Sequence, residues 1–166
     1  MKPNKQPQMS RWGIGPLFTG ISLIYSLIIF GLSYFYFPLR FTLFREVVNF
    51  LVGGILMFIG LLLFFAGAYT LHKKFNSEKL QTKGVYALMR HPIYGSWIVF
   101  IIPGIVIISG YVLGLTIPIF MYGTFKRLIR KEETCLQQRF GKEYWKYQQK
   151  VRAVFPMISW RRLKKD

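Results

Sequence analysis

The chain has 166 residues, of which 52% are hydrophobic and 18% aromatic, and its net charge is +17 at pH 7. This length fits one domain, and the apolar runs are too long for a soluble core. The basic residues cluster beside those runs, which is typical of positive-inside membrane topology and argues against a nucleic-acid partner. One cysteine (Cys135) excludes an internal disulfide, and with two histidines (His72 and His91) it argues against a metal site.

Two uncharged runs in the first half of the chain predict membrane-spanning helices. Residues 1–11 form a basic, flexible arm, and the first run then extends from Trp12 to Leu39. The second run extends from Val47 to Leu71, and each exceeds the ~20 apolar residues that cross a bilayer. Gly60 and Gly67 are seven residues apart and share one helix face, where small residues allow close helix packing.

A third uncharged run, from Pro92 to Phe125, predicts a helical hairpin because it is too long for one perpendicular helix. Pro103-Gly104 and Ser109-Gly110 offer breaks, and we place the turn near Ser109-Gly110-Tyr111. The second arm continues into a charged segment that is expected to stop at Gly141. A short interfacial helix with three aromatic residues follows, from Lys142 to Val151.

The distribution of Lys and Arg predicts the orientation. The N-terminal arm has three, the first loop two, the second loop five, the hairpin turn none, and the segment from Lys126 onward thirteen. With four spans and both termini in the cytoplasm, 21 of the 23 lie inside. The second loop and the far end of the hairpin then share the cytoplasmic side.

Polar residues at the two open ends of the hairpin form the candidate site. Arg90 and His91 directly precede Pro92, which suits the first turn of a helix, and ionisable groups at a membrane boundary predict function. The chain has six acidic residues, and two of them form the adjacent pair Glu132-Glu133. Taken singly, these residues would be read as charge balance and helix capping, and Tyr86 and Tyr94 as interfacial aromatics.

As one ordered string, the motifs are more specific. Gly84-Val85-Tyr86 and the run from Arg90 to Gly95 precede Glu132-Glu133, and the run from Phe140 to Tyr147 and Phe155-Pro156 follow. This string resembles the isoprenylcysteine carboxyl methyltransferase family and its relatives, the membrane phospholipid N-methyltransferases. The resemblance covers about residues 69–157, roughly half of the chain.

The resemblance implies an all-α integral membrane fold of about four transmembrane helices, with a C-terminal helical hairpin and cytoplasmic cofactor-binding loops. It implies a single domain in which two N-terminal spans (12–71) precede a methyltransferase core (72–157) and a basic tail (158–166). The implied activity is transfer of a methyl group from S-adenosylmethionine directly to a lipophilic or membrane-embedded acceptor, leaving S-adenosylhomocysteine.

Carried over residue by residue, the resemblance implies these cofactor contacts: Glu78, Lys79, Leu80, Gln81, Tyr86, His91, Pro92, Ile93, Tyr94 and Glu132, with Glu133 as the neighbouring alternative. Glu132 or Glu133 can pair with the ammonium of the cofactor, and Arg90 or His91 with its carboxylate. Tyr86 or Tyr94 can cover the adenine or face the sulfonium. We expect positioning by Arg90 and Glu132 and no indispensable catalytic base, because in-line methyl transfer depends on alignment and exclusion of water.

The substrate side departs from the family. The carboxyl methyltransferases carry an arginine four residues before the first glutamate, and this chain has Leu128 there. Arg127 and Arg130 flank it but present other helix faces. A carboxyl, amine or thiol acceptor therefore stays open, with Gly95 and Ser96 expected at its lateral entry between helices.

Two other classes fit parts of the pattern. The segment after Glu132-Glu133 also looks like the tail of NADPH-dependent sterol reductases, which are much longer. A non-enzymatic membrane scaffold could use Gly60 and Gly67 for packing. Stabilisation by S-adenosylhomocysteine, by NADPH or by neither separates the three.

Overall fold

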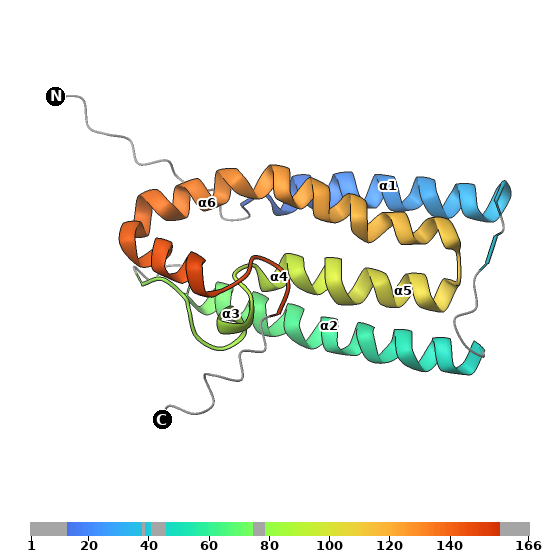
Figure 1. Cartoon of the computed structure of the whole chain (residues 1–166), viewed down its shortest axis with the longest axis horizontal. Helices are drawn as coiled ribbons and strands as arrows, with labels where there is room; N and C mark the ends of the chain where they lie inside the picture. Colours follow the sequence, from blue (N-terminus) through green and yellow to red (C-terminus); the bar gives the residue numbers. More distant parts are fainter. Residues whose placement is uncertain (1–12, 38, 41–45, 75–78, 157–166) are drawn as a thin grey trace.

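The computed structural model describes residues 13–37, 39–40, 46–74 and 79–156 (Figure 1). Within these ranges every element is a helix, and four helical stretches are long and apolar enough to cross a membrane. The predicted all-α membrane fold is confirmed. The elements are α1 (Gly15–Phe35), α2 (Glu46–Lys74), α3 (Val85–Leu88), α4 (Pro92–Gly95), η1 (Ser96–Ile101), α5 (Ile102–Ser109), η2 (Val112–Leu115) and α6 (Thr116–Lys150).

The hairpin forms the centre of the bundle, with one N-terminal span on each of its arms. α1 packs along α6, and α2 packs along the continuous helix made of α4, η1 and α5 (Figure 1). The two arms meet at Gly110, whose φ of 67° lies in the left-handed region that favours glycine. The predicted turn at Ser109-Gly110-Tyr111 is confirmed.

Three glycines of α2 line its contact with the hairpin. A Cβ on Gly60 would lie 2.7 Å from Ile101 Cγ1, and one on Gly67 would lie 3.1 Å from Pro92 Cγ. The predicted packing role of these two glycines is confirmed, and Gly53 extends the row, because a Cβ there would lie 2.6 Å from the Gly104 carbonyl oxygen. The seven-residue spacing brings the two helices into near-backbone contact.

The irregular part of the first arm is not at the predicted break, Pro103-Gly104. The helix continues through Pro103, and the irregularity is the π-helical segment η1 just before it, where the Ile102 N–H donates to the Trp97 carbonyl. Proline lacks an N–H and cannot complete the α-helical bond to the residue four positions earlier. The wider turn of η1 absorbs that defect without ending the helix.

The chain reverses at Gly141 and returns to the second loop. Gly141 has φ 50° and ψ −123°, so α6 is two helices joined at a kink, as predicted. After α6, the backbone of Arg152 and Ala153 accepts hydrogen bonds of 2.9 Å from the N–H groups of Arg90 and His91. These bonds hold the C-terminal segment against the loop that precedes α4.

Candidate functional site

The loop before α4 and the charged part of α6, from Lys126 onward, meet in a cluster of charged side chains. Arg90 Nη1 lies 2.7 Å from Glu133 Oε1, and His91 Nε2 lies 3.3 Å from the same oxygen. His91 Nδ1 lies 3.9 Å from Glu132 Oε1, at the outer limit of an ion pair. The predicted meeting of the two hairpin ends is confirmed, and these side chains pair with one another across 42 residues of sequence.

The two glutamates have different surroundings. Glu133 also accepts a 3.3 Å hydrogen bond on its second oxygen from Gln148 Nε2, so both of its oxygens have protein partners. Glu132 Oε2 is buried and has no hydrogen-bond partner, and neither has the buried Nε of Arg90. A buried acceptor and a buried donor without protein partners therefore lie in one cluster, which is costly unless a ligand or water satisfies them.

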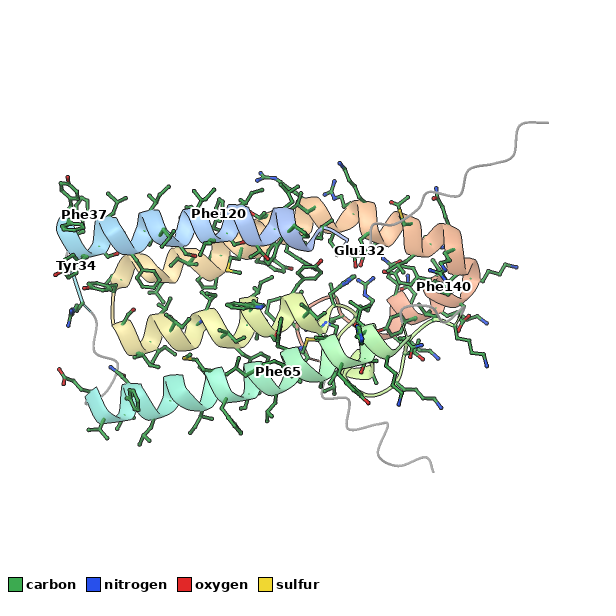
Figure 2. All side chains as sticks on the ribbon, turned by 180° about the vertical axis from the view of Figure 1, so that it is seen from behind. Tyr34, Phe37, Phe65, Phe120, Glu132 and Phe140 are labelled. Atoms are coloured by element: carbon green, nitrogen blue, oxygen red, sulfur yellow. The ribbon has the colours of Figure 1, made fainter. Side chains whose placement is uncertain are left out.

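Gly13 covers Glu132 from the start of α1. A Cβ on Gly13 would lie 2.7 Å from Glu132 Oε2, and its φ of 52° is in the left-handed region. Only glycine fits this approach without strain. Figure 2 shows Glu132 directed inward from α6, at the end of the bundle opposite Tyr34 and Phe37.

Tyrosines enclose the carboxylates. Tyr94 faces Glu132 and packs edge-on against Phe18 of α1, with ring centroids 5.3 Å apart. Burial, and then the charge of Glu132, raises the pKa of Tyr86 to about 12, so its phenol stays neutral at physiological pH. Tyr147 donates to the Tyr86 carbonyl, and the buried Tyr144 hydroxyl accepts a 3.4 Å hydrogen bond from Arg90 Nη1. The site therefore has an aromatic wall as well as charge.

The other predicted cofactor contacts that the structure describes make contacts outside the charged cluster. Leu80 packs on the cluster of Tyr144, Tyr147 and Val151. Gln81 donates to the backbone of Lys79, and Pro92 and Ile93 lie against Gly67 of α2. Glu78 lies outside the described residues. No bound cofactor tests these assignments, and they stay predictions.

The predicted substrate residues fall in two different environments. A Cβ on Gly95 would lie 2.5 Å from Met89 Sδ and 2.7 Å from the Val154 carbonyl oxygen, and Ser96 is fully buried. Both residues pack the interior beneath the loop, so their substitution perturbs folding as well as any acceptor path. Arg127 and Arg130 are exposed on α6, whereas Leu128 packs partly buried on the hydrophobic core.

Sequence reasoning did not place residues 151–154 or Gly13 at the site. A hollow of about 590 Å³ opens beside Arg90, lined by Tyr122, Gln148, Gln149 and residues 151–155. The available signal for this segment was the pair Val151 and Val154, both buried, which follows the polar run from Gln148 to Lys150. Gly13 carried no sequence signal, because it lies outside every motif of the ordered string.

A family model, curated relatives and a solved structure all point to the same group of membrane methyltransferases. Residues 47–138 match the model of the isoprenylcysteine carboxyl methyltransferase (ICMT) family. A probable protein-S-isoprenylcysteine O-methyltransferase of Oryza sativa subsp. indica is 34% identical over 84 residues, which are 51% of this chain and 44% of that protein. The Homo sapiens protein-S-isoprenylcysteine O-methyltransferase is 31% identical over 88 residues, 53% of this chain and 31% of that protein.

A solved structure of the eukaryotic intramembrane Ras methyltransferase ICMT superposes with a TM-score of 0.63 at 26% identity. The superposition covers 93% of this chain and 58% of that one. The matched stretches span less than half of the length of the two sequence relatives. The family match thus includes the hairpin, the loop before it and the paired glutamates.

Proposed function

Because the chain belongs to the isoprenylcysteine carboxyl methyltransferase family, we propose that it is an integral membrane enzyme that methylates a lipophilic acceptor with S-adenosylmethionine. The family match includes the loop with Arg90 and His91 and both glutamates. S-adenosylmethionine supplies, when bound, an electrophilic methyl group on a sulfonium. The chain itself must then bind, orient and enclose the two reactants.

The observation that carries this proposal is the pair of unpartnered buried atoms. Glu132 Oε2 can accept from an ammonium, and the Arg90 Nε–H can donate to a carboxylate. An ammonium and a carboxylate are the two charged groups at one end of the cofactor, and Glu132 and Arg90 present the complementary charge for each. Glu133 holds Arg90 and His91 in place through its own contacts.

The remaining residues of the site align the reactants and exclude water. Tyr86 and Tyr94 provide ring faces beside Glu132, where an adenine can stack or a sulfonium can be stabilised. The bonds from Arg90 and His91 to the backbone of residues 152 and 153 close the site from the side of the C-terminal segment. No base is required of His91, because in-line methyl transfer depends on alignment and exclusion of water.

Thermal unfolding tests the cofactor. S-adenosylhomocysteine at 100 times its dissociation constant should add about 2.7 kcal/mol of stability, a rise in Tm of several degrees. NADPH should give no shift. A shift with NADPH alone would favour a reductase, and a shift with neither would favour a scaffold.

We propose that the acceptor is not held by a carboxylate, because the arginine that the family resemblance places four residues before Glu132 is absent from this chain. Leu128 occupies that position and packs against the apolar core. A screen of lipid extracts with methyl-labelled cofactor would identify the acceptor, and Leu128→Arg should raise turnover of a prenylcysteine relative to an uncharged acceptor. Unchanged relative turnover would show that this position does not read the acceptor.

We also propose that both termini lie in the cytoplasm. Single cysteines introduced at Thr42 and Lys79 in a Cys135→Ser background should be labelled from opposite sides of the membrane. Labelling of both from one side would contradict the four-span topology.

A further inference from the structure

A second polar hollow lies at the opposite end of the bundle from the methyl-transfer site. It measures about 500 Å³ and is lined by Arg40, Glu46, Val47, Asn49, Phe50 and residues 108–110. It lies between the start of α2 and the hairpin turn, at the end of the bundle where Figure 2 places Tyr34 and Phe37. The distance from Glu132 excludes a part in the reaction itself.

Arg40 is fixed in this hollow by the hairpin turn. Its guanidinium lies over the Tyr111 ring, 5.0 Å from the centroid, and its Nη2 donates to the Tyr111 hydroxyl at 3.3 Å. The backbone supports this position, because Arg40 pairs with Tyr111 in an isolated β-bridge. A guanidinium has five N–H donors, so most of them remain directed to other groups or to solvent.

The polar groups of the hollow are not satisfied by one another. Every ion pair among the described residues involves Glu132 or Glu133, so Arg40 and Glu46 line one hollow without a direct ion pair. Asn49 is 6% exposed, and its side-chain carbonyl oxygen has no hydrogen-bond partner. A buried amide oxygen without a donor is destabilising unless a ligand or water supplies one.

We propose that this hollow binds the headgroup of a zwitterionic phospholipid with a primary amine. The phosphate would lie at Arg40, and the ammonium would donate to Asn49 Oδ1 and Glu46. A trimethylammonium headgroup has no N–H to donate, so Asn49 discriminates phosphatidylethanolamine from phosphatidylcholine.

The flanking surface is suited to a lipid rather than to a free headgroup. Val47 and Phe50 border the hollow and are 70% and 65% exposed. Both lie at the start of a predicted span, where the apolar bilayer core gives way to headgroups. An acyl chain can cover these side chains while the headgroup occupies the polar part.

Lipid retention tests the proposal. The full chain would be placed in nanodiscs of equimolar phosphatidylethanolamine and phosphatidylcholine, extracted in mild detergent, and its retained lipids counted by native mass spectrometry. The wild type should retain phosphatidylethanolamine about tenfold over phosphatidylcholine, the effect of one charge-assisted hydrogen bond from the ammonium. Asn49→Leu should lower this preference, because only Glu46 then accepts from the ammonium, and Gln138→Leu, an exposed amide on α6, should keep it.

Equal retention of both lipids by the wild type would overturn the proposal, and it is the result expected if Asn49 binds only water. An unchanged preference in Asn49→Leu would overturn it as well. If Asn49→Leu does not fold, the exposed Glu46 carries the test. Glu46→Gln should lower the retention of phosphatidylethanolamine more than that of phosphatidylcholine, because both headgroups carry a positive charge but only the primary ammonium donates N–H groups to the carboxylate. Displacement of the lipid by millimolar free phosphoethanolamine would assign the hollow to a soluble ligand instead.

Discussion

The helix from Pro92 to Ser109 has two very different neighbours. Along its length it contacts α2 through Gly53, Gly60 and Gly67, where the packing depends on the absence of side chains. At its first turn it meets α6 through charged groups that bind one another and leave Glu132 Oε2 and Arg90 Nε without partners. The first region makes its contacts within the protein, whereas the second leaves two buried polar atoms for a ligand or water to satisfy.

This difference separates stability from binding. Changes in the glycine row should alter the free energy of unfolding and leave ligand affinity unchanged. Changes at the unpartnered atoms should do the opposite, because those atoms contribute little to the ligand-free fold. The following variants test that separation, from the largest expected effect to the smallest.

Gly95→Leu lies between the two regions and should have the largest effect. Its side chain must displace Met89 and the Val154 backbone, so we expect a loss of about 3 kcal/mol or more in unfolding free energy. Denaturant or thermal unfolding in detergent measures this. Wild-type stability with selective loss of acceptor turnover would instead place Gly95 on the acceptor path.

Glu132→Gln should mainly affect binding. Replacing a charge-assisted contact with a neutral one costs about 1.5–3 kcal/mol, or roughly tenfold to a hundredfold in the dissociation constant of S-adenosylhomocysteine measured by calorimetry. Tm without ligand should change little.

Glu133→Gln is the matched control for Glu132→Gln. It removes the charge that holds Arg90 and His91, so its ligand-free Tm should fall. Equal affinity losses with equal Tm losses in the two variants would contradict the division of roles between the glutamates.

Gly53→Ala tests the glycine row. The added methyl group would meet the Gly104 carbonyl oxygen at 2.6 Å, and the backbone cannot move aside freely, so we expect a loss of about 1–3 kcal/mol in stability. Gly54→Ala is the control, because nothing lies within 4 Å of a Cβ there. Affinity for S-adenosylhomocysteine should match the wild type in both variants.

Gly13→Ala should have the smallest effect, a loss of affinity of about 1 kcal/mol as the methyl group displaces Glu132 Oε2. Gly15→Ala is the control, because its Cβ would only reach the Tyr94 hydroxyl at 3.8 Å. In a double-mutant cycle with Glu132→Asp, whose side chain is shorter, the two losses should not add. Additive losses would show that Gly13 acts elsewhere.

The sequence was sufficient for the elements whose cause is local. Uncharged runs predicted the spans, Gly110 and Gly141 predicted the turn and the kink, and the seven-residue spacing predicted the α2 contact. The meeting of the loop with Glu132-Glu133 followed from topology alone, because both lie at the open ends of one hairpin.

The missed features depend on contacts between distant segments. Nothing local to Gly13 indicates that it covers Glu132, and nothing in Arg152 or Ala153 indicates that their carbonyl groups bind the loop, because backbone bonds leave no side-chain signature. The break predicted at Pro103-Gly104 was wrong, because a proline affects the turn that precedes it, and the irregularity is the π-helical segment Ser96–Ile101. Roles of individual residues in cofactor and substrate binding remain predictions.

The hydrogen bonds from Arg90 and His91 to residues 152 and 153 have a consequence for biogenesis. During translation at roughly 5–20 residues per second, the loop waits several seconds for the carbonyl groups that lie about 60 residues later. During that interval the first two spans can already be inserted and the third span is synthesised, while the charged loop has no backbone partner. The candidate site is thus assembled last, and a ribosome that stalls before Ala153 leaves inserted spans without it.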